Sequence, residues 1–127
     1  MRNTKRRILI VDDEPDTLRL VRDLLVQAHY SVTAASSSVE ALMHIHLTKF
    51  DLILLDLMMP GIDGHQLAEH LSSHWDTFEI PVIVVSCRKD AESKFWAKEY
   101  GCVRYLEKPF SPAELLETVG EYTHGRT

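Results

Sequence analysis

The sequence predicts an α/β fold in which short parallel strands alternate with helices. Five short runs are mostly apolar, and several are rich in β-branched residues, which is typical of strands buried on both faces of a sheet. They cover residues 8–11, 32–35, 52–55, 82–85 and 103–106. The segments that follow these runs place apolar residues at helical spacing. This alternation favours one mostly parallel sheet with helices on both faces, and a ligand site beyond the carboxyl ends of the strands.

Local signals mark where the helices begin and end. Pro15 suits the first turn of the first helix, and the serines at 36–38 can cap the second. Gly101 is a natural stop for the fourth helix, while Ser111 and Pro112 suit the cap and the first position of the fifth. The helices are therefore expected at about 15–28, 38–46, 64–73, 90–100 and 112–122.

Helical spacing also predicts which side chains face the core. Val39, Leu42 and Ile45, with His46 as a further candidate, are expected to form the inward stripe of the second helix. In the fourth helix, Phe95 is the better core candidate together with Ala91. The adjacent Trp96 is then expected to be partly exposed, because a helix cannot bury two consecutive residues equally.

Size and composition indicate one globular domain. The 127 residues are 45% hydrophobic and 26% charged, and no apolar run approaches the roughly 20 residues needed to cross a bilayer. The polar start lacks the apolar stretch of a signal peptide, so we expect a cytoplasmic protein without membrane contact. A net charge of -5 argues against direct nucleic-acid binding by this domain.

Cys87 and Cys102 lack metal-site spacing and are expected to be reduced thiols packed near strand ends.

Polar side chains follow the predicted strands at the points where the strands end. Asp12 and Asp13 follow the first strand, Asp56 the third, Ser86 the fourth and Lys108 the fifth. The carboxyl ends of parallel strands lie along one edge of a sheet, so these side chains should gather there. Carboxylates, a hydroxyl and an amine are what magnesium-dependent transfer of a phosphoryl group onto a carboxylate requires.

Four segments, in order along the chain, resemble the receiver domain of two-component response regulators. They are Val11-Asp12-Asp13-Glu14-Pro15, Leu55-Asp56-Leu57-Met58-Met59-Pro60-Gly61-Ile62-Asp63-Gly64, Val85-Ser86 and Lys108-Pro109-Phe110. The resemblance runs from about residue 5 to 122 and treats the chain, 1–127, as a single receiver domain with short tails. It implies a flavodoxin-like sheet with strand order 2-1-3-4-5.

The resemblance implies a phosphoryl-transfer chemistry for the acidic residues. Asp56 would accept a phosphoryl group from a phosphohistidine on a sensor histidine kinase or a histidine phosphotransfer protein. Asp12, Asp13, Asp56 and the backbone carbonyl of Met58 would bind Mg²⁺, a hard cation that prefers carboxylates and phosphate oxygens. The three carboxylates should raise one another's pKa, and a divalent cation would relieve their repulsion. The domain would promote its own phosphorylation without being a turnover enzyme.

The resemblance also implies a switch that carries the signal to a partner. Lys108 would place its ammonium against Asp56 and then against the phosphoryl oxygens. Ser86 would move toward the phosphoryl group, and Tyr105 would follow from an outward to an inward rotamer. The fourth helix, fifth strand and fifth helix would then present a changed surface to a downstream output domain or protein, or to a second copy in a dimer. The Lys108-Pro109 bond is expected to be cis.

Simpler roles are open for the same side chains. Asp56 could cap the turn that follows its strand, and Asp13 or Glu14 could cap the first helix. Lys108 could be a solvated surface lysine. Tyr105 could be a half-buried aromatic residue that does not switch.

Two other classes of protein share parts of the pattern. A magnesium-dependent phosphohydrolase that works through an aspartyl phosphate uses Asp-x-Asp at the nucleophile strand, but Met58 occupies the position of the second acid. A flavin-binding protein with this fold would need a hydroxyl- and glycine-rich phosphate loop after the first strand, where this chain has acidic residues.

The chain also contains 7 histidines, of which His70 and His74 have the spacing of neighbours on one helix face. Such a pair can bind a metal ion. Surface histidines on a polar face explain the pair more simply, because the sequence shows no third ligand.

Overall fold

Strands and helices alternate along the whole of the described chain. The computed structural model describes residues 5–59 and 64–123. The elements are β1 (Arg7–Val11), α1 (Pro15–Gln27), β2 (Ser31–Ala35), α2 (Ser38–Leu47), β3 (Leu52–Leu55), α3 (Gly64–Ser73), β4 (Val82–Ser86), α4 (Ala91–Glu99), β5 (Arg104–Glu107) and α5 (Pro112–Thr123). Each strand boundary lies within one residue of its predicted position, so the predicted alternation is confirmed.

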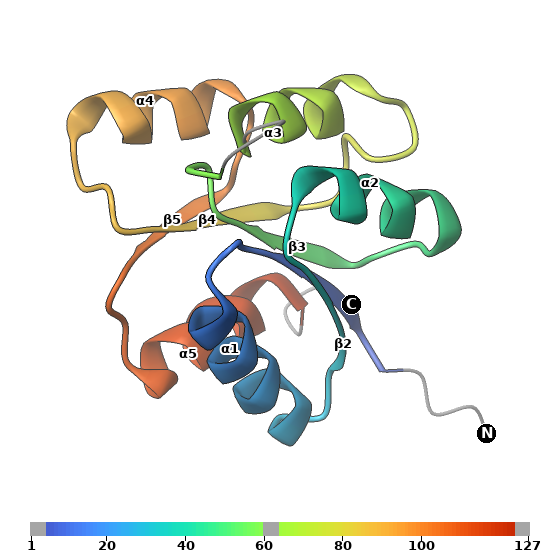
Figure 1. Cartoon of the computed structure of the whole chain (residues 1–127), viewed down its shortest axis with the longest axis vertical. Helices are drawn as coiled ribbons and strands as arrows, with labels where there is room; N and C mark the ends of the chain where they lie inside the picture. The colour runs from blue at the N-terminus through green and yellow to red at the C-terminus, as the bar shows by residue number, and fades with distance from the viewer. Residues whose placement is uncertain (1–4, 60–63, 124–127) are drawn as a thin grey trace.

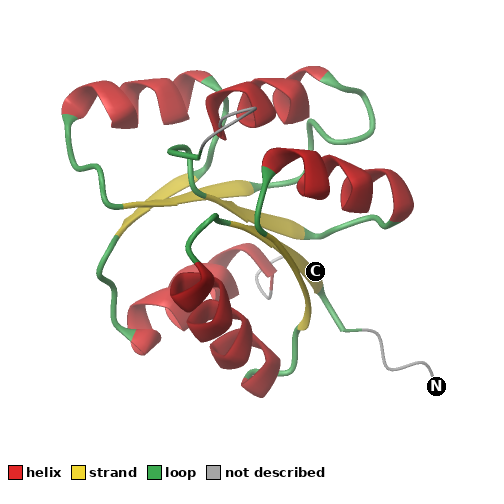
Figure 2. Ribbon diagram, viewed as in Figure 1, coloured by secondary structure: helices red, strands yellow, loops and turns green. Residues whose placement is uncertain are grey.

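One parallel sheet separates two layers of helices. The strand order is β2-β1-β3-β4-β5, and each neighbouring pair is parallel. Helices α1 and α5 cover one face of the sheet, while α2, α3 and α4 cover the other (Figure 1, Figure 2). The fold class and strand order that the sequence predicts are therefore confirmed. Because β3 pairs directly with β1, the chain segments that leave these two strands lie side by side.

The core has one part on each side of the sheet, because successive residues of a strand point to opposite faces. In β1, Ile8 and Ile10 pack toward α1 and α5, whereas Leu9 and Val11 pack toward α2 and α3. Every residue of β3 is buried, which is the pattern of a central strand covered on both faces. This packing holds the ends of β1 and β3 in a fixed position.

Helix starts follow the signals in the sequence. The Ser37 hydroxyl caps α2 by accepting from the backbone N–H of Glu40 at 3.1 Å. The Asp90 carboxylate caps α4 by accepting from the N–H of Ser93 at 3.0 Å. The Ser111 hydroxyl accepts from the N–H of Glu114 at 3.0 Å, as predicted for the fifth helix. Each bond satisfies a donor that the helix cannot satisfy itself.

The predicted inward faces of two helices are only partly confirmed. In α2, Leu42 and Ile45 pack against the core as predicted, but Val39 is wrong: it is 55% exposed, and Ser38 and Ala41 are buried instead. In α4 only Ala97 is buried, so the inward prediction for Phe95, which is 55% exposed, is wrong, whereas Trp96 is partly exposed as predicted, at 41%. A small alanine at the contact lets α4 lie close to the sheet, and the larger side chains are then on its outer sides.

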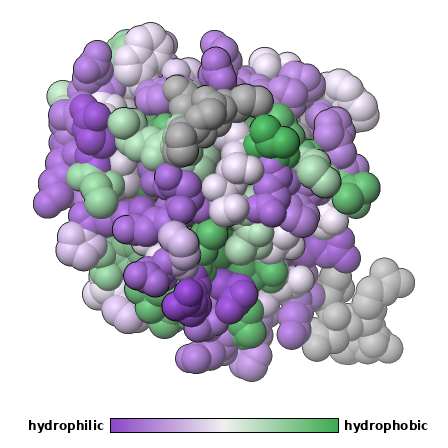
Figure 3. Space-filling model, in the orientation of Figure 1, coloured by the Kyte–Doolittle hydropathy of each residue, from purple (hydrophilic) through white to green (hydrophobic). Residues whose placement is uncertain are grey.

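The surface contains both hydrophilic and hydrophobic residues. On the face in Figure 3, hydrophilic residues surround small, separate groups of hydrophobic atoms. Within residues 5–59 and 64–123, none of the helices combines the length and the hydrophobicity that a membrane-spanning helix needs.

We expect Leu25→Ala to lower the free energy of unfolding by about 2–5 kcal/mol, because it leaves a cavity between α1 and the sheet. Leu25 is fully buried, whereas Leu20, on the same helix, is 52% exposed. Leu20→Ala is the matched control and should cost less than about 1 kcal/mol. Urea unfolding measures both, and equal losses would contradict the described packing of α1.

Candidate functional site

Three carboxylates lie together where β1 and β3 end. Asp12 and Asp13 follow β1, and Asp56 follows β3. One oxygen of each carboxylate lies within 4.8 Å of the others, and among the described residues no other group of three His, Cys, Asp or Glu side chains is as close. Asp12 and Asp56 are buried, and Asp13 is exposed. The donors are hard oxygen ligands around one point, which is the type of site that suits Mg²⁺.

Backbone hydrogen bonds hold the two buried carboxylates. The N–H of Asp56 donates to the carbonyl of Val11 at 2.9 Å, and the N–H of Asp12 donates to the carbonyl of Ala35 at 3.1 Å. These bonds extend the sheet pairing one residue past the strands. Each carboxylate then accepts on Oδ1 from a backbone N–H two residues later, Glu14 for Asp12 and Met58 for Asp56. Asp56 therefore caps its turn, and this simpler role exists together with its place in the cluster.

Lys108 supplies the positive charge of the cluster. Its Nζ lies 2.7 Å from Asp12 Oδ2, 3.6 Å from Asp56 Oδ2 and 3.7 Å from Glu14 Oε1. Its side chain is 10% exposed, so it is not a solvated surface lysine. The sequence predicts Lys108 against Asp56; the structure places it among three acids, closest to Asp12. The Lys108-Pro109 bond is cis, as predicted.

The charges of the cluster are unevenly balanced. Burial raises the pKa of Asp56, and the charges of Asp12 and Asp13 act in the same direction, while the Met58 N–H and Lys108 oppose them. The predicted rise from neighbouring carboxylates is thus present at Asp56. Burial also works against the charged form of Lys108, but its hydrogen bond to Asp12 and the nearby carboxylates raise its pKa overall. Lys108 is therefore a cation, and the site carries excess negative charge.

Ser86 and Tyr105 both form hydrogen bonds with the backbone of Arg88. The Ser86 hydroxyl is buried at the end of β4 and accepts from the N–H of Arg88 at 3.1 Å. The half-buried Tyr105 on β5 donates its hydroxyl proton to the carbonyl of Arg88 at 2.7 Å. The loop between β4 and α4 thus connects the serine beside the carboxylates to the tyrosine. Nothing in the sequence pattern indicates this role for the Arg88 backbone.

Gly64 allows α3 to begin directly against the backbone of the site. A Cβ at this position would lie 2.3 Å from the carbonyl oxygen of Asp56 and 2.3 Å from the Cα of Leu57. Only a residue without a side chain fits there. The motif residues 60–63, which precede Gly64, lie outside the described residues. The predicted contribution of the Met58 carbonyl to a metal site stays a prediction.

The two cysteines are free thiols, as predicted, but they differ in environment. Cys102 is half-buried, and burial raises the pKa of its thiol to about 12. Cys87 is exposed beside Ser86, so the expectation that it is packed is wrong.

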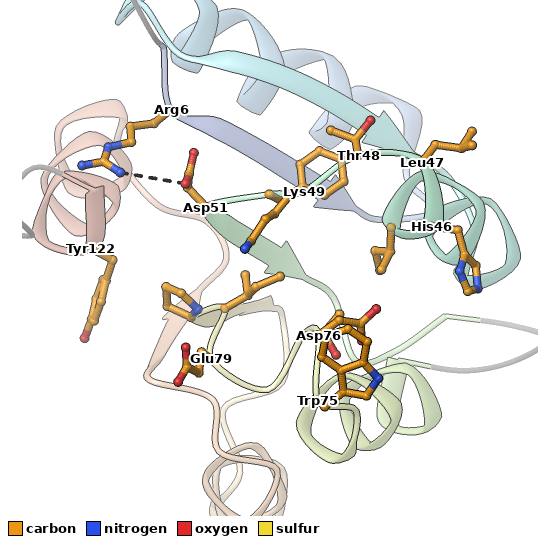
Figure 4. Close-up of a pocket in the computed structure, with 15 residues that line it drawn as sticks. Arg6, His46, Leu47, Thr48, Lys49, Asp51, Trp75, Asp76, Glu79 and Tyr122 are labelled. Carbon is orange, nitrogen blue, oxygen red and sulfur yellow. Dashed lines mark ion pairs between the residues drawn. The ribbon is translucent and has the colours of Figure 1, made fainter.

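The described residues also form cavities outside the carboxylate cluster. One of about 540 Å³ adjoins it and is lined partly by Leu57, Met58 and Trp96. Another of about 830 Å³ lies at the opposite edge of the sheet, among the residues that precede β1, β3 and β4 (Figure 4). The larger cavity is therefore not part of the carboxylate site.

Comparison with known sequences decides the family. The family model of the response regulator receiver domain matches residues 8–120. The chain belongs to this family. Receiver domains are signalling domains of two-component systems and are not turnover enzymes in the ordinary sense.

Similar receiver-domain proteins differ in length. Protein PilH of Pseudomonas aeruginosa is 33% identical over 119 residues, which cover 94% of this chain and 98% of PilH. The transcriptional regulatory protein BaeR of Escherichia coli is 38% identical over 113 residues, which cover 89% of this chain and 46% of BaeR. PhoB, the phosphate regulon regulator of Pseudomonas aeruginosa, is 38% identical, with coverage of 87% and 48%. The chain thus spans nearly all of PilH and about half of these transcriptional regulators.

Solved structures of receiver domains share the fold. The chemotaxis protein CheY4 of Vibrio cholerae has a TM-score of 0.89 and is 28% identical, with 94% of this chain and 99% of CheY4 covered. The receiver domain of a Pseudomonas aeruginosa sensor histidine kinase has a TM-score of 0.85 and is 24% identical, with 94% and 98% covered. That structure has a magnesium ion coordinated in the active-site cleft.

We expect Asp56→Asn to raise the stability of the receiver domain at neutral pH in the presence of EDTA. The folded pKa of Asp56 is raised by burial, so the carboxylate form destabilises the folded state. Stability should fall as the pH rises from the ordinary pKa of aspartate, about 4, to the folded value, and this loss should be absent in the variant.

Urea unfolding at a series of pH values measures this difference. Asp23→Asn, at an exposed position on α1, is the matched control and should gain nothing. An Asp56→Asn protein less stable than the wild type at neutral pH would contradict the electrostatic description of the site.

Proposed function

We propose that this receiver domain accepts a phosphoryl group on Asp56 from a sensor histidine kinase or a histidine phosphotransfer protein. The observation that carries the proposal is the convergence of Asp12, Asp13 and Asp56 with the Lys108 ammonium at one edge of the sheet. Phosphoryl transfer needs little more from a protein than a positioned nucleophile and well-placed charges.

The geometry favours one oxygen of Asp56 as the nucleophile. Oδ1 accepts a hydrogen bond from the Met58 N–H, while Oδ2 faces Lys108. Oδ2 would attack the phosphorus of a phosphohistidine. The P–N bond would break, the imidazole nitrogen would leave with its electron pair, and an acyl phosphate would form on Asp56.

We propose Asp12, Asp13, Asp56 and the carbonyl of Met58 as the residues that would hold Mg²⁺. The oxygen-only donor set and the excess negative charge of the site fit this ion. When bound, Mg²⁺ would neutralise charge on the phosphoryl oxygens. The magnesium in the related kinase receiver domain supports the choice.

Lys108 would hold the transferred group once it is present. Its ammonium lies between Asp12 and Asp56, so a short shift of the flexible side chain would bring it to the phosphoryl oxygens. Met58 offers no carboxyl group as a general acid, which favours a receiver over a phosphohydrolase. The domain would promote its own phosphorylation and dephosphorylation only.

Ser86, Tyr105 and the Arg88 backbone would form the switch. A phosphoryl group on Asp56 would attract the Ser86 hydroxyl away from the Arg88 N–H. The loop would then move, and the bond between Tyr105 and the Arg88 carbonyl would break. This would change the surface of α4, β5 and α5, which we propose as the contact for an output domain, a separate output protein or a second copy.

Membership of the receiver family supports proposals about the extent of the domain, its location and its partners. We propose that residues 1–127 form a single receiver domain, with a core over about 5–122, that acts in the cytoplasm and does not itself bind nucleic acid or a membrane. Relatives that consist of a receiver alone and relatives about twice as long both exist among the matches. The output is therefore proposed only as a partner or a linked domain.

We expect one phosphoryl adduct per chain after incubation with acetyl phosphate and Mg²⁺, measured by intact mass. Asp56→Ala should abolish the adduct because it removes the nucleophile. Asp13→Asn should keep the nucleophile but require more Mg²⁺, since it removes one ligand. Asp23→Asn is the control and should react like the wild type. An adduct that persists in Asp56→Ala would place the chemistry on another residue.

We expect beryllofluoride with Mg²⁺ to break the bond between the Tyr105 hydroxyl and the Arg88 carbonyl and turn the ring inward. NMR of ¹³C-labelled tyrosine would follow the ring. Ser86→Ala is the matched variant and should leave the ring where it is, because it has no hydroxyl to follow the phosphoryl mimic. An unchanged Tyr105 signal in the wild type would refute the switch while leaving the phosphorylation of Asp56 intact.

A further inference from the structure

The outer face of α2 carries a row of large apolar side chains. Val39, Met43 and Leu47 follow one another at intervals of four residues, so they lie on the same side of the helix. They are 55%, 60% and 80% exposed, while other side chains of α2 fill its contact with the sheet. On the face in Figure 3, groups of hydrophobic atoms follow the course that α2 has in Figure 1. These three residues, the α2 stripe, are therefore available to a partner.

Trp75 extends this apolar surface beyond the end of α2. It lies in the segment that follows α3, and it is 86% exposed. Trp75 and Leu47 both line the large cavity, and Figure 4 shows them at the same end of it. Tryptophan is enriched among the residues that contribute most to binding at protein interfaces, and exposed apolar side chains that gather in one region mark interaction sites. The α2 stripe and Trp75 together thus have the composition of a contact surface.

The polar side chains of α2 are complementary to those of a second α2 that runs in the opposite direction. The first turn carries Glu40, and the last turn carries His44 and His46. An antiparallel pair places the acidic first turn of each helix beside the histidines of the other, and an imidazole N–H can donate to a carboxylate in either protonation state. The helix dipoles are also opposed in such a pair. A parallel pair would place like ends together and would lack both contributions.

The α2 stripe is symmetric about its middle residue. Val39 and Leu47 lie four residues on either side of Met43. With a two-fold axis beside Met43, the two methionines would meet each other, and Leu47 of each copy would meet Val39 of the other. An interface with two-fold symmetry needs a surface that is complementary to itself. The positions of the apolar and polar side chains on α2 meet this requirement.

We propose that two copies of this chain associate through antiparallel contact of their α2 helices, with Trp75 of each copy at the edge of the contact. Stable interfaces bury about 800 Å² per partner, and four side chains from each copy form a small interface by that standard, so the dimer should be weak. α2 supplies no residue of the carboxylate cluster and no part of the α4, β5 and α5 surface. The contact therefore does not require phosphorylation of Asp56.

Analytical ultracentrifugation of the untagged chain tests the proposal, in EDTA and without a phosphoryl donor. A Cys87→Ser background prevents dimers through the exposed thiol. We expect a reversible monomer–dimer equilibrium with a Kd between about 1 µM and 1 mM. Met43→Glu should raise this Kd about tenfold or more, because it places two carboxylates against each other on the axis. Leu47→Ser should weaken the dimer without an added charge, while Leu20→Glu, on the exposed side of α1, is the matched control and should stay within about twofold.

Oxidative crosslinking of single-cysteine variants in the same background tests the direction of the helices. Met43→Cys should crosslink to itself. Val39→Cys and Leu47→Cys should each fail to crosslink alone but should crosslink to each other when the two proteins are mixed. A parallel pair would give the opposite result, with Val39→Cys joined to itself, and this outcome would overturn the antiparallel arrangement.

Three further results would overturn the proposal. A chain that stays monomeric up to about 1 mM would leave the α2 stripe to a different protein. A dimer undiminished in both Met43→Glu and Leu47→Ser would not use α2. A dimer lost in Phe95→Glu instead would lie on α4.

Discussion

The arrangement of the functional edge depends on the buried ammonium of Lys108. It lies within 4 Å of three carboxylates, and among residues 5–59 and 64–123 it is the cation paired with the buried Asp12. One lysine cannot balance this many acids, and burial and the nearby acids together raise the pKa of Asp56. The folded state thus holds negative charge that a further cation or a proton would relieve. This residual charge suits the site to a divalent cation, and it arises from the same packing that stabilises the fold.

The parallel sheet holds these charged side chains close together despite their repulsion. The carboxylates lie on backbone that continues the pairing of β1 with β2 and β3, so their positions are set by main-chain hydrogen bonds and by cores on both faces of the sheet. The contact of Gly64 with the backbone of Asp56 and Leu57 fixes the start of α3 in the same way. Repulsion between the acids therefore cannot be relieved by moving them apart, which leaves cation binding or protonation of a carboxylate as the routes to relief.

The backbone of Arg88 connects the carboxylate edge to a residue nearer the surface. Ser86 is a buried neighbour of the carboxylate edge, and Tyr105 lies at its outer side, but the two do not need to touch. Each bonds to the main chain of Arg88, one through its N–H and the other through its carbonyl. In the switch that we propose, this loop residue would couple a change in charge to a change in the surface beside α4 and β5.

The sequence by itself determined the order of strands and helices, the caps of α2 and α5, and which polar side chains gather at one edge of the sheet. Those features depend on local pattern: buried strands are apolar, caps are polar, and functional groups follow strand ends. Only the tertiary structure decided which faces of α2 and α4 are inward, because short helices with several apolar residues can pack in more than one rotation, and a small alanine settled the contact at Ala97. It also decided that Lys108 lies closest to Asp12. Distances between side chains on different elements depend on tertiary packing, and the residue pattern of a single sequence does not specify that packing.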